Sequence, residues 1–212
     1  MIRYVALIVL LSTSDASAQD ASLSGRIERT DGQGTCGAIL LEADLVLTAA
    51  HCLDPALETY IYRPGRDGET RTLGAIYRHP VYSLAPPSLF RFQFDLAVAN
   101  LGASEPAHTL SPLAVGAPAV VGEILAVERW RREMPAPVRT DCRVTRSNDG
   151  LIILDCAVIQ GHSGAPVLRV GPDGAELVAI VVGSTSDGGR PAALAVEVEP
   201  RLAVLRRLSG RD

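Results

Sequence analysis

Three short strings in this 212-residue chain carry side chains that could cooperate in nucleophilic catalysis. Residues 48–52 read Thr-Ala-Ala-His-Cys, and residues 161–166 read Gly-His-Ser-Gly-Ala-Pro, which places Ser163 among residues small enough for a tight turn. Between them, Asp95 opens an apolar run typical of a buried strand. A serine can attack a carbonyl carbon when a histidine takes its proton and an aspartate orients the imidazole. The order His51, Asp95, Ser163 therefore predicts acyl transfer through a covalent intermediate.

The order of these residues distinguishes between classes of serine hydrolase. An α/β-hydrolase places its acid and its histidine after the nucleophile, and no histidine follows Ser163. A subtilisin-like order needs an aspartate before the histidine, and Asp44 could serve. The segments after Asp44 lack the alternating strands and helices of an α/β sheet, so this order is disfavoured.

The strings resemble those of the trypsin- and chymotrypsin-like serine peptidases. In that family they read TAAHC, D-I/L-A-L and GDSGGP, and here they read TAAHC, DLAV and GHSGAP. Residues 34–40 resemble the family's strand with the cysteine that bridges to the one after the catalytic histidine, and residues 78–82 resemble its His-Pro-x-Tyr string. The resemblance runs from about Gly25 to the C-terminus. It implies an all-β fold of two packed antiparallel β-barrels with a C-terminal helix.

The resemblance also implies the roles of individual residues. Ser163 is the expected nucleophile, His51 the general base and then acid, and Asp95 the orienting acid of a serine endopeptidase that hydrolyses polypeptides without a cofactor. The backbone N–H groups of Gly161 and Ser163 are expected to form the oxyanion hole. His162 stands where zymogen-activated members carry an aspartate, and we expect it to serve as a structural side chain of the turn. Two alternatives stay open: a catalytically silent binding module, and an esterase with the same triad.

The specificity pocket is only loosely defined by the sequence. Trypsin carries an aspartate six residues before its nucleophile, and the corresponding residue here is Ala157. Asp155 reaches that place only if the alignment contains a gap. The remaining pocket walls correspond to four small or apolar residues, Val182, Gly183, Ser184 and Ala192. Small or medium apolar residues are therefore expected before the scissile bond.

Short apolar segments separated by turn residues recur along the chain, a pattern typical of all-β barrels. Asp149-Gly150 between two of them predicts a hairpin turn, while Pro200 and the leucine spacing after it predict a helix at about 200–208. The segments of strand length are 46–49, 58–62, 71–77, 95–101, 120–127, 138–145, 151–155, 165–170, 177–182 and 192–198.

We therefore expect two domains after a leader. The N-terminal barrel spans residues 19–112 and carries His51 and Asp95, and the C-terminal barrel spans residues 113–212 and carries Ser163. Residues 102–118 are rich in Ala, Pro, Gly and Ser, and we place the connection between the barrels there.

Residues 1–18 predict a secretory signal, with an early arginine, a short apolar core and an Ala-Ser-Ala end, cut after Ala18. The apolar core is shorter than the roughly 20 residues of a membrane span, so the mature chain is expected to be secreted or periplasmic without a span. In an oxidising compartment, four cysteines most simply form two disulfides. Three pairings are possible. The local one joins Cys36 to Cys52 and Cys142 to Cys156, and its first bridge matches the family's.

Charge and composition exclude other classes of function. The formal net charge of −4 offers no broad cationic surface for nucleic acid. No Cys-x-x-Cys is present and the four histidines lack ligand spacing, so no metal site is expected. The roughly 190 residues left after removal of the signal suit one compact unit, and we expect a monomer.

Overall fold

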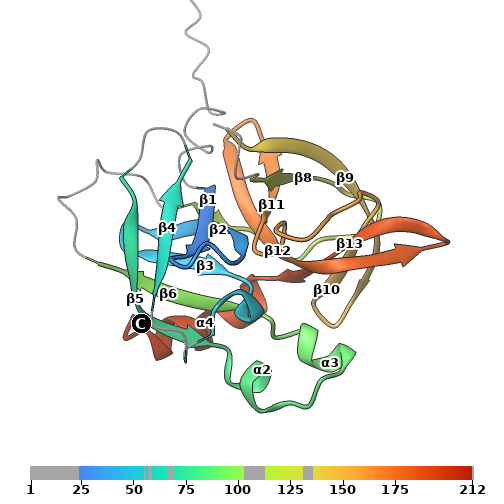
Figure 1. Cartoon of the computed structure of the whole chain (residues 1–212). Coiled ribbons are helices and arrows are strands. Elements are labelled where there is room, and N and C mark those ends of the chain that lie inside the picture. Colours follow the sequence, from blue (N-terminus) through green and yellow to red (C-terminus); the bar gives the residue numbers. More distant parts are fainter. Residues whose placement is uncertain are drawn as a thin grey trace, which may run out of the picture.

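The computed structural model describes residues 24–54, 56, 59–65, 69–102, 113–130 and 136–211. Two bodies of β-strands lie side by side, and short helices lie along one edge (Figure 1). The predicted signal segment, residues 1–18, lies outside the described residues. No helix in the described ranges is both long and apolar enough to cross a membrane.

The first body is a closed antiparallel barrel of six strands in the order β1-β2-β3-β6-β5-β4. Its strands form because aliphatic and aromatic residues fill its interior; every residue of β3 is buried. A single 3₁₀ turn, η1 (Ala50–Cys52), follows β3 directly. The strands are β1 (Ser24–Arg29), β2 (Thr35–Glu42), β3 (Leu45–Thr48), β4 (Tyr60–Pro64), β5 (Arg71–Arg78) and β6 (Ala97–Leu101).

The second body contains six antiparallel strands in the order β11-β8-β9-β10-β13-β12, and the β11–β12 pairing closes it. A two-residue strand, β7 (Ala114–Val115), joins β12 in parallel. The predicted hairpin turn is confirmed, because Asp149 and Gly150 both adopt positive φ, 49° and 76°, as a primed turn requires. The strands are β8 (Ile124–Arg129), β9 (Val138–Asn148), β10 (Leu151–Leu154), β11 (Pro166–Gly171), β12 (Gly174–Asp187) and β13 (Arg190–Glu197).

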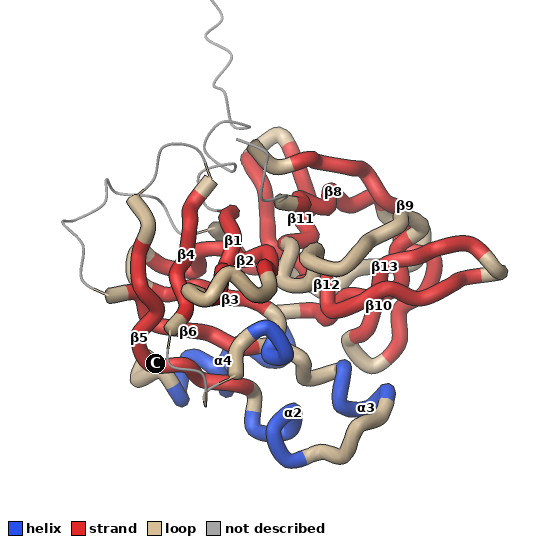
Figure 2. The backbone as a smooth tube through the Cα atoms, viewed as in Figure 1, coloured by secondary structure: helices blue, strands red, loops and turns tan. Residues whose placement is uncertain are grey.

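Among the described residues, three α-helices accompany the barrels: α2 (Pro80–Leu84), α3 (Leu89–Phe92) and α4 (Glu199–Leu208). Figure 2 shows how little of the fold is helical. The predicted C-terminal helix is confirmed as α4. Its residues Leu202 and Leu205 pack into a core shared with the first barrel, and Arg211 beyond it pairs with Glu42 and Asp44 of that barrel. The C-terminal segment therefore returns to the N-terminal barrel.

The expected fold class is confirmed by these barrels. Strands β1 and β7, the 3₁₀ turn η1 and helices α2 and α3 were not expected, and β12 extends five residues beyond the predicted 177–182 segment. The expected connection at 102–118 contains β7, and its residues 103–112 lie outside the described part of the chain. The domain boundary between residues 112 and 113 thus stays a prediction.

Candidate active site

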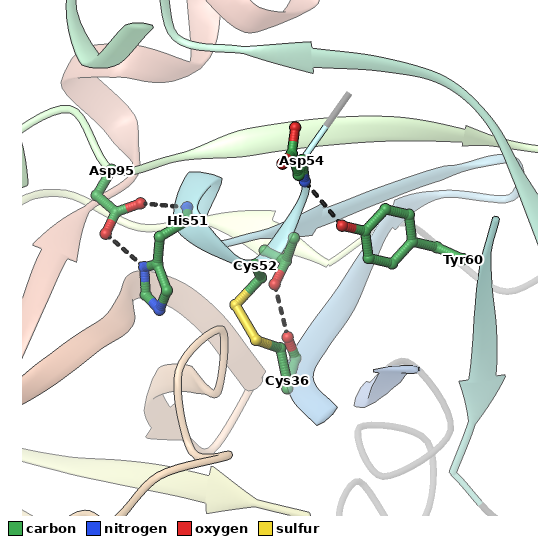
Figure 3. The surroundings of a disulfide bond; sticks show 8 residues. Cys36, His51, Cys52, Asp54, Tyr60 and Asp95 are labelled. Atoms are coloured by element: carbon green, nitrogen blue, oxygen red, sulfur yellow. Dashed lines mark hydrogen bonds and ion pairs between the residues drawn. A yellow bond between two sulfur atoms is a disulfide. The ribbon is translucent and has the colours of Figure 1, made fainter. Parts of the chain in front are cut away.

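Asp95 and His51 are hydrogen-bonded to each other beside the paired ends of β3 and β6 in the first barrel. Asp95 precedes β6 and is fully buried, so its carboxylate needs protein donors. Oδ1 accepts the backbone N–H of His51 at 2.9 Å, and Oδ2 lies 2.7 Å from His51 Nδ1. The second ring nitrogen points away from the carboxylate (Figure 3). Asp95 therefore holds the Nδ1–H tautomer and leaves Nε2 available to accept a proton.

Ser163 lies in a turn that glycines make possible. Gly161 and Gly164 have φ of 91° and 81°, a region that residues with a Cβ rarely adopt. The turn is held by hydrogen bonds from His162 N–H to Ile159 O at 3.0 Å and from Gly164 N–H to Val181 O at 2.7 Å. Within the described residues, the N–H groups of Gly161 and Ser163 donate to no acceptor. Two backbone N–H groups, one on each side of His162, thus have no acceptor among the described residues.

The two barrels meet at this turn through Gly37 of β2. Gly37 N–H donates to Ser163 O at 2.7 Å, and Gly37 O accepts the Thr48 hydroxyl at 2.7 Å. A Cβ on Gly164 would overlap Gly37 O. The two chain segments can therefore approach this closely only because residue 164 is a glycine. This contact joins the serine turn of the second barrel to β2, which pairs with β3, the strand directly before the histidine segment.

A cleft of about 380 Å³ contains both proposed reactive side chains. It is lined by His51 and Ser163 and also by Gly161, Gln160, Tyr60 and Ile27, among others. On one wall, Tyr60 Oη accepts the backbone N–H of Asp54 at 2.8 Å (Figure 3). The structure therefore brings together the histidine and serine that are 112 positions apart in the sequence.

A family model described as a trypsin-like peptidase domain matches residues 34–194, which is more than half of the chain. The chain belongs to the trypsin-like peptidase family. The match spans all three strings that carry the proposed triad, and it supports a function of the peptidase type. A comparison with curated proteins finds no match.

Both predicted disulfides of this family member are confirmed. Cys36 and Cys52 are bridged with their Cα atoms 6.2 Å apart, and Cys142 and Cys156 with theirs 5.6 Å apart. The first bridge ties β2 to η1 beside His51. Ligand atoms of His51 and these two cysteines lie within 4.8 Å of one another, but both sulfurs are committed to the bridge, whereas metals bind thiolates.

Four of the five residues predicted for the specificity pocket, Val182, Gly183, Ser184 and Ala192, lie in the paired strands β12 and β13. Ala157 is exposed and its carbonyl accepts a hydrogen bond from Arg129, while Val182 and Ala192 are buried in the paired strands β12 and β13. Gly183 is half-buried and Ser184 is exposed. None of these five described residues lines the cleft that holds Ser163. The pocket assignment therefore stays a prediction.

Hydrogen bonds hold two further residues that the sequence analysis singled out, Asp155 and His162. Asp155 is exposed, and its Oδ1 accepts Arg143 N–H at 2.6 Å in the β9–β10 region, so it gives no support to an acidic pocket base. His162 is buried, and its Nδ1 accepts Ile159 N–H at 3.3 Å. That bond agrees with the structural role expected for His162 inside the turn.

Sequence reasoning missed the residues that join the barrels at the site. Gly37 lies within a string used for the family resemblance, but its contact with Ser163 depends on a partner in the other barrel. Arg201 was also missed; its side chain reaches the turn that precedes Asp95. The one available signal was the glycine directly after Cys36 in a strand, which indicates a close approach of another backbone.

Proposed function

We propose that this chain is an exported serine endopeptidase in which Ser163, His51 and Asp95 form the catalytic triad. The observation that carries the proposal is the pair of hydrogen bonds between His51 and the buried Asp95, in a cleft that Ser163 also lines. An imidazole with Nδ1 protonated and Nε2 free is the form that acts as a general base.

In the proposed reaction, Ser163 Oγ attacks the carbonyl carbon of a peptide bond as His51 Nε2 takes the hydroxyl proton. The imidazolium that forms is stabilised by the Asp95 carboxylate. His51 then donates the proton to the leaving amine, the C–N bond breaks, and an acyl-enzyme remains on Ser163. Water, deprotonated by His51, hydrolyses this ester and restores the serine.

The negative charge of the tetrahedral intermediate requires donors that are already in place. The N–H groups of Gly161 and Ser163 are suited to this because they lie in the same turn, on either side of His162, and donate to no acceptor among the described residues. Donors of this kind contribute roughly 3 to 4 kcal/mol each to stabilisation of the transition state. The hydrogen bonds from His162 and Gly164 hold the turn, so little reorganisation accompanies the reaction.

Export forms part of the proposal because two disulfides are typical of an oxidising compartment. Residues 1–18 would direct this export and be removed after Ala18. A polypeptide is the expected substrate, since the family is defined by peptidase domains.

The test compares the purified mature chain with two serine variants on a denatured protein substrate. Ser163→Ala should lower kcat on the order of 10⁶-fold if the triad acts as a unit. Ser186→Ala, an exposed serine of β12, should retain the activity of the unmodified chain. Mass spectrometry of the products should show cleavage at internal peptide bonds.

The other outcomes are distinct. Hydrolysis of short acyl esters without cleavage of any peptide would identify an esterase. A folded chain that hydrolyses neither class would be a silent binding module. Equal activity of Ser163→Ala and Ser186→Ala would exclude Ser163 as the nucleophile.

A further inference from the structure

A buried arginine, Arg201, links the C-terminal helix to the turn that precedes Asp95. Arg201 lies in α4 and is only 7 % exposed. Its Nε donates to the backbone carbonyl of Gln93 at 2.5 Å, and its Nη2 donates to that of Asp149 at 2.7 Å. Gln93 lies two residues before Asp95, and Asp149 lies in the β9–β10 turn of the second barrel. One guanidinium therefore joins three segments that are distant in the sequence.

The two residues on either side of Asp95, Phe94 and Leu96, are held by contacts with Arg201 and His79. The guanidinium carbon lies 5.4 Å from the ring centroid of Phe94, a cation–π distance. His79 packs on that ring with the two ring centroids 4.9 Å apart. The backbone N–H of His79 donates to the backbone carbonyl of Leu96 at 2.9 Å. Asp95 itself is thus flanked by two fixed residues, while its carboxylate bonds to His51.

The energetics of Arg201 indicate a role beyond packing. No carboxylate of the described residues lies within 4.0 Å of its guanidinium, although Glu197 and Asp149 contribute favourable charge at longer range. Burial lowers the pKa of Arg201, which reflects the free energy cost of removing the charge from water. A Cβ on Gly150 would overlap the guanidinium, so the hairpin turn closes tightly around it. Burial of the Arg201 charge therefore costs free energy, and the carbonyls of Gln93 and Asp149 fix the position of its guanidinium.

We propose that Arg201 is a positioning residue that holds Asp95 in register with His51. Through the carbonyl of Gln93 it fixes the turn from which Asp95 emerges, and through Asp149 it ties that turn to the barrel that carries Ser163. Loss of the guanidinium would let the turn relax and would lengthen the hydrogen bonds of Asp95 to His51. The inference rests on the proposed function, because it takes Asp95 as the triad acid.

Arg201→Met tests this role, because methionine keeps an apolar stem but removes both donors. A displacement on the order of 1 Å in the catalytic geometry lowers the rate by about 100-fold, so kcat should fall roughly 10- to 100-fold with KM nearly unchanged. The acid limb of the pH profile of kcat/KM should move, because the environment of His51 changes. The proton NMR signal of the His51 Nδ1–H should shift upfield or broaden.

Arg211→Met is the matched control. Arg211 follows the same helix, but its side chain pairs with Glu42 and Asp44 and not with the turn that precedes Asp95. Its loss should lower the melting temperature but leave the pH profile and the His51 signal unchanged. If Arg201→Met has the kcat, pH profile and His51 signal of Arg211→Met at a temperature where both are folded, the proposal is wrong.

A second variant covers the case in which Arg201→Met does not fold. Arg201→Lys keeps the buried charge but lacks the planar fork that reaches two carbonyls. A severalfold fall in kcat with a displaced pH profile is expected, and unmodified values of both would overturn the proposal. The NMR signal does not depend on hydrolysis. A chain without peptidase activity but with a perturbed His51 signal in the Arg201 variants would therefore refute the proposed function alone.

Discussion

Replacing Gly37 by alanine perturbs the contact through which the two barrels form one site. Gly37 N–H donates to Ser163 O at 2.7 Å. A Cβ at this position would lie 2.6 Å from the nitrogen of Ala165 and 2.7 Å from its Cα. Both are backbone atoms of the serine turn, so no side chain can rotate away to relieve the overlap.

The size of the effect follows from these distances. Ordinary contacts of a Cβ begin at 3.4 Å, so the turn or β2 must move by about 0.8 Å. A shift on the order of 1 Å in a catalytic group costs about 100-fold in rate, and overpacking of this kind costs about 1 to 3 kcal/mol of stability. We therefore expect Gly37→Ala to lower kcat/KM roughly 10- to 100-fold and to remain folded.

The assay combines kcat/KM on a fluorogenic peptide with thermal unfolding. Gly74→Ala is the matched control, because Gly74 also lies in a strand of the first barrel and its Cβ would meet Asn100 O at an ordinary 3.5 Å. That variant should retain the unmodified kcat/KM. If Gly37→Ala also retains it, the barrels do not set the position of Ser163 through this contact, and the account of the site is refuted.

Three further predictions concern the acid, the bridge and a buried histidine. Asp95→Asn should keep the fold but lower kcat by about 10⁴, because the amide favours the wrong tautomer of His51; a loss below tenfold would contradict this. Replacing Cys36 and Cys52 by serine should lower the free energy of unfolding by about 3 kcal/mol in denaturant titrations, and an unchanged midpoint would contradict it. Burial, aided by the charge of Arg201, lowers the pKa of His79, so the unfolded chain binds this proton more readily. The contribution of His79 to the free energy of unfolding should therefore be fully present above about pH 6.5 and decline below it. His79→Gln should flatten that decline.

The strands could be predicted where burial leaves a pattern in the sequence. Segments 71–77, 138–145 and 151–155 differ from the observed strands by no more than three residues at either end. The outer part of β12 could not be predicted, because its residues after Val182 pair with β13 beyond the core and show no alternation of burial. Helix α2 is too short for a helical period, although Pro80 at its start was a usable signal.

The proposed triad could be predicted from short sequence motifs, whereas the rest of the site depends on contacts between residues that are distant in the sequence. Each proposed triad residue could be found from its immediate neighbours in the sequence, because each lies in a short string that resembles a family motif. Gly37 acts through Ser163 and Arg201 through Gln93, partners more than 100 positions away, which a single sequence does not reveal. The pocket walls depend on strand register, and the β12–β13 pairing shifts between Val181 and Gly183, so counting residues along the chain cannot by itself assign them.

Covalent labelling of the nucleophile tests the central claim most directly. The purified mature chain is treated with a fluorophosphonate, and the modified peptide is located by mass spectrometry, with His51→Ala and Ser186→Ala treated alongside. The account predicts a single adduct on Ser163, none in His51→Ala, and full labelling in Ser186→Ala. An adduct on another residue, or undiminished labelling of Ser163 in His51→Ala, would contradict it.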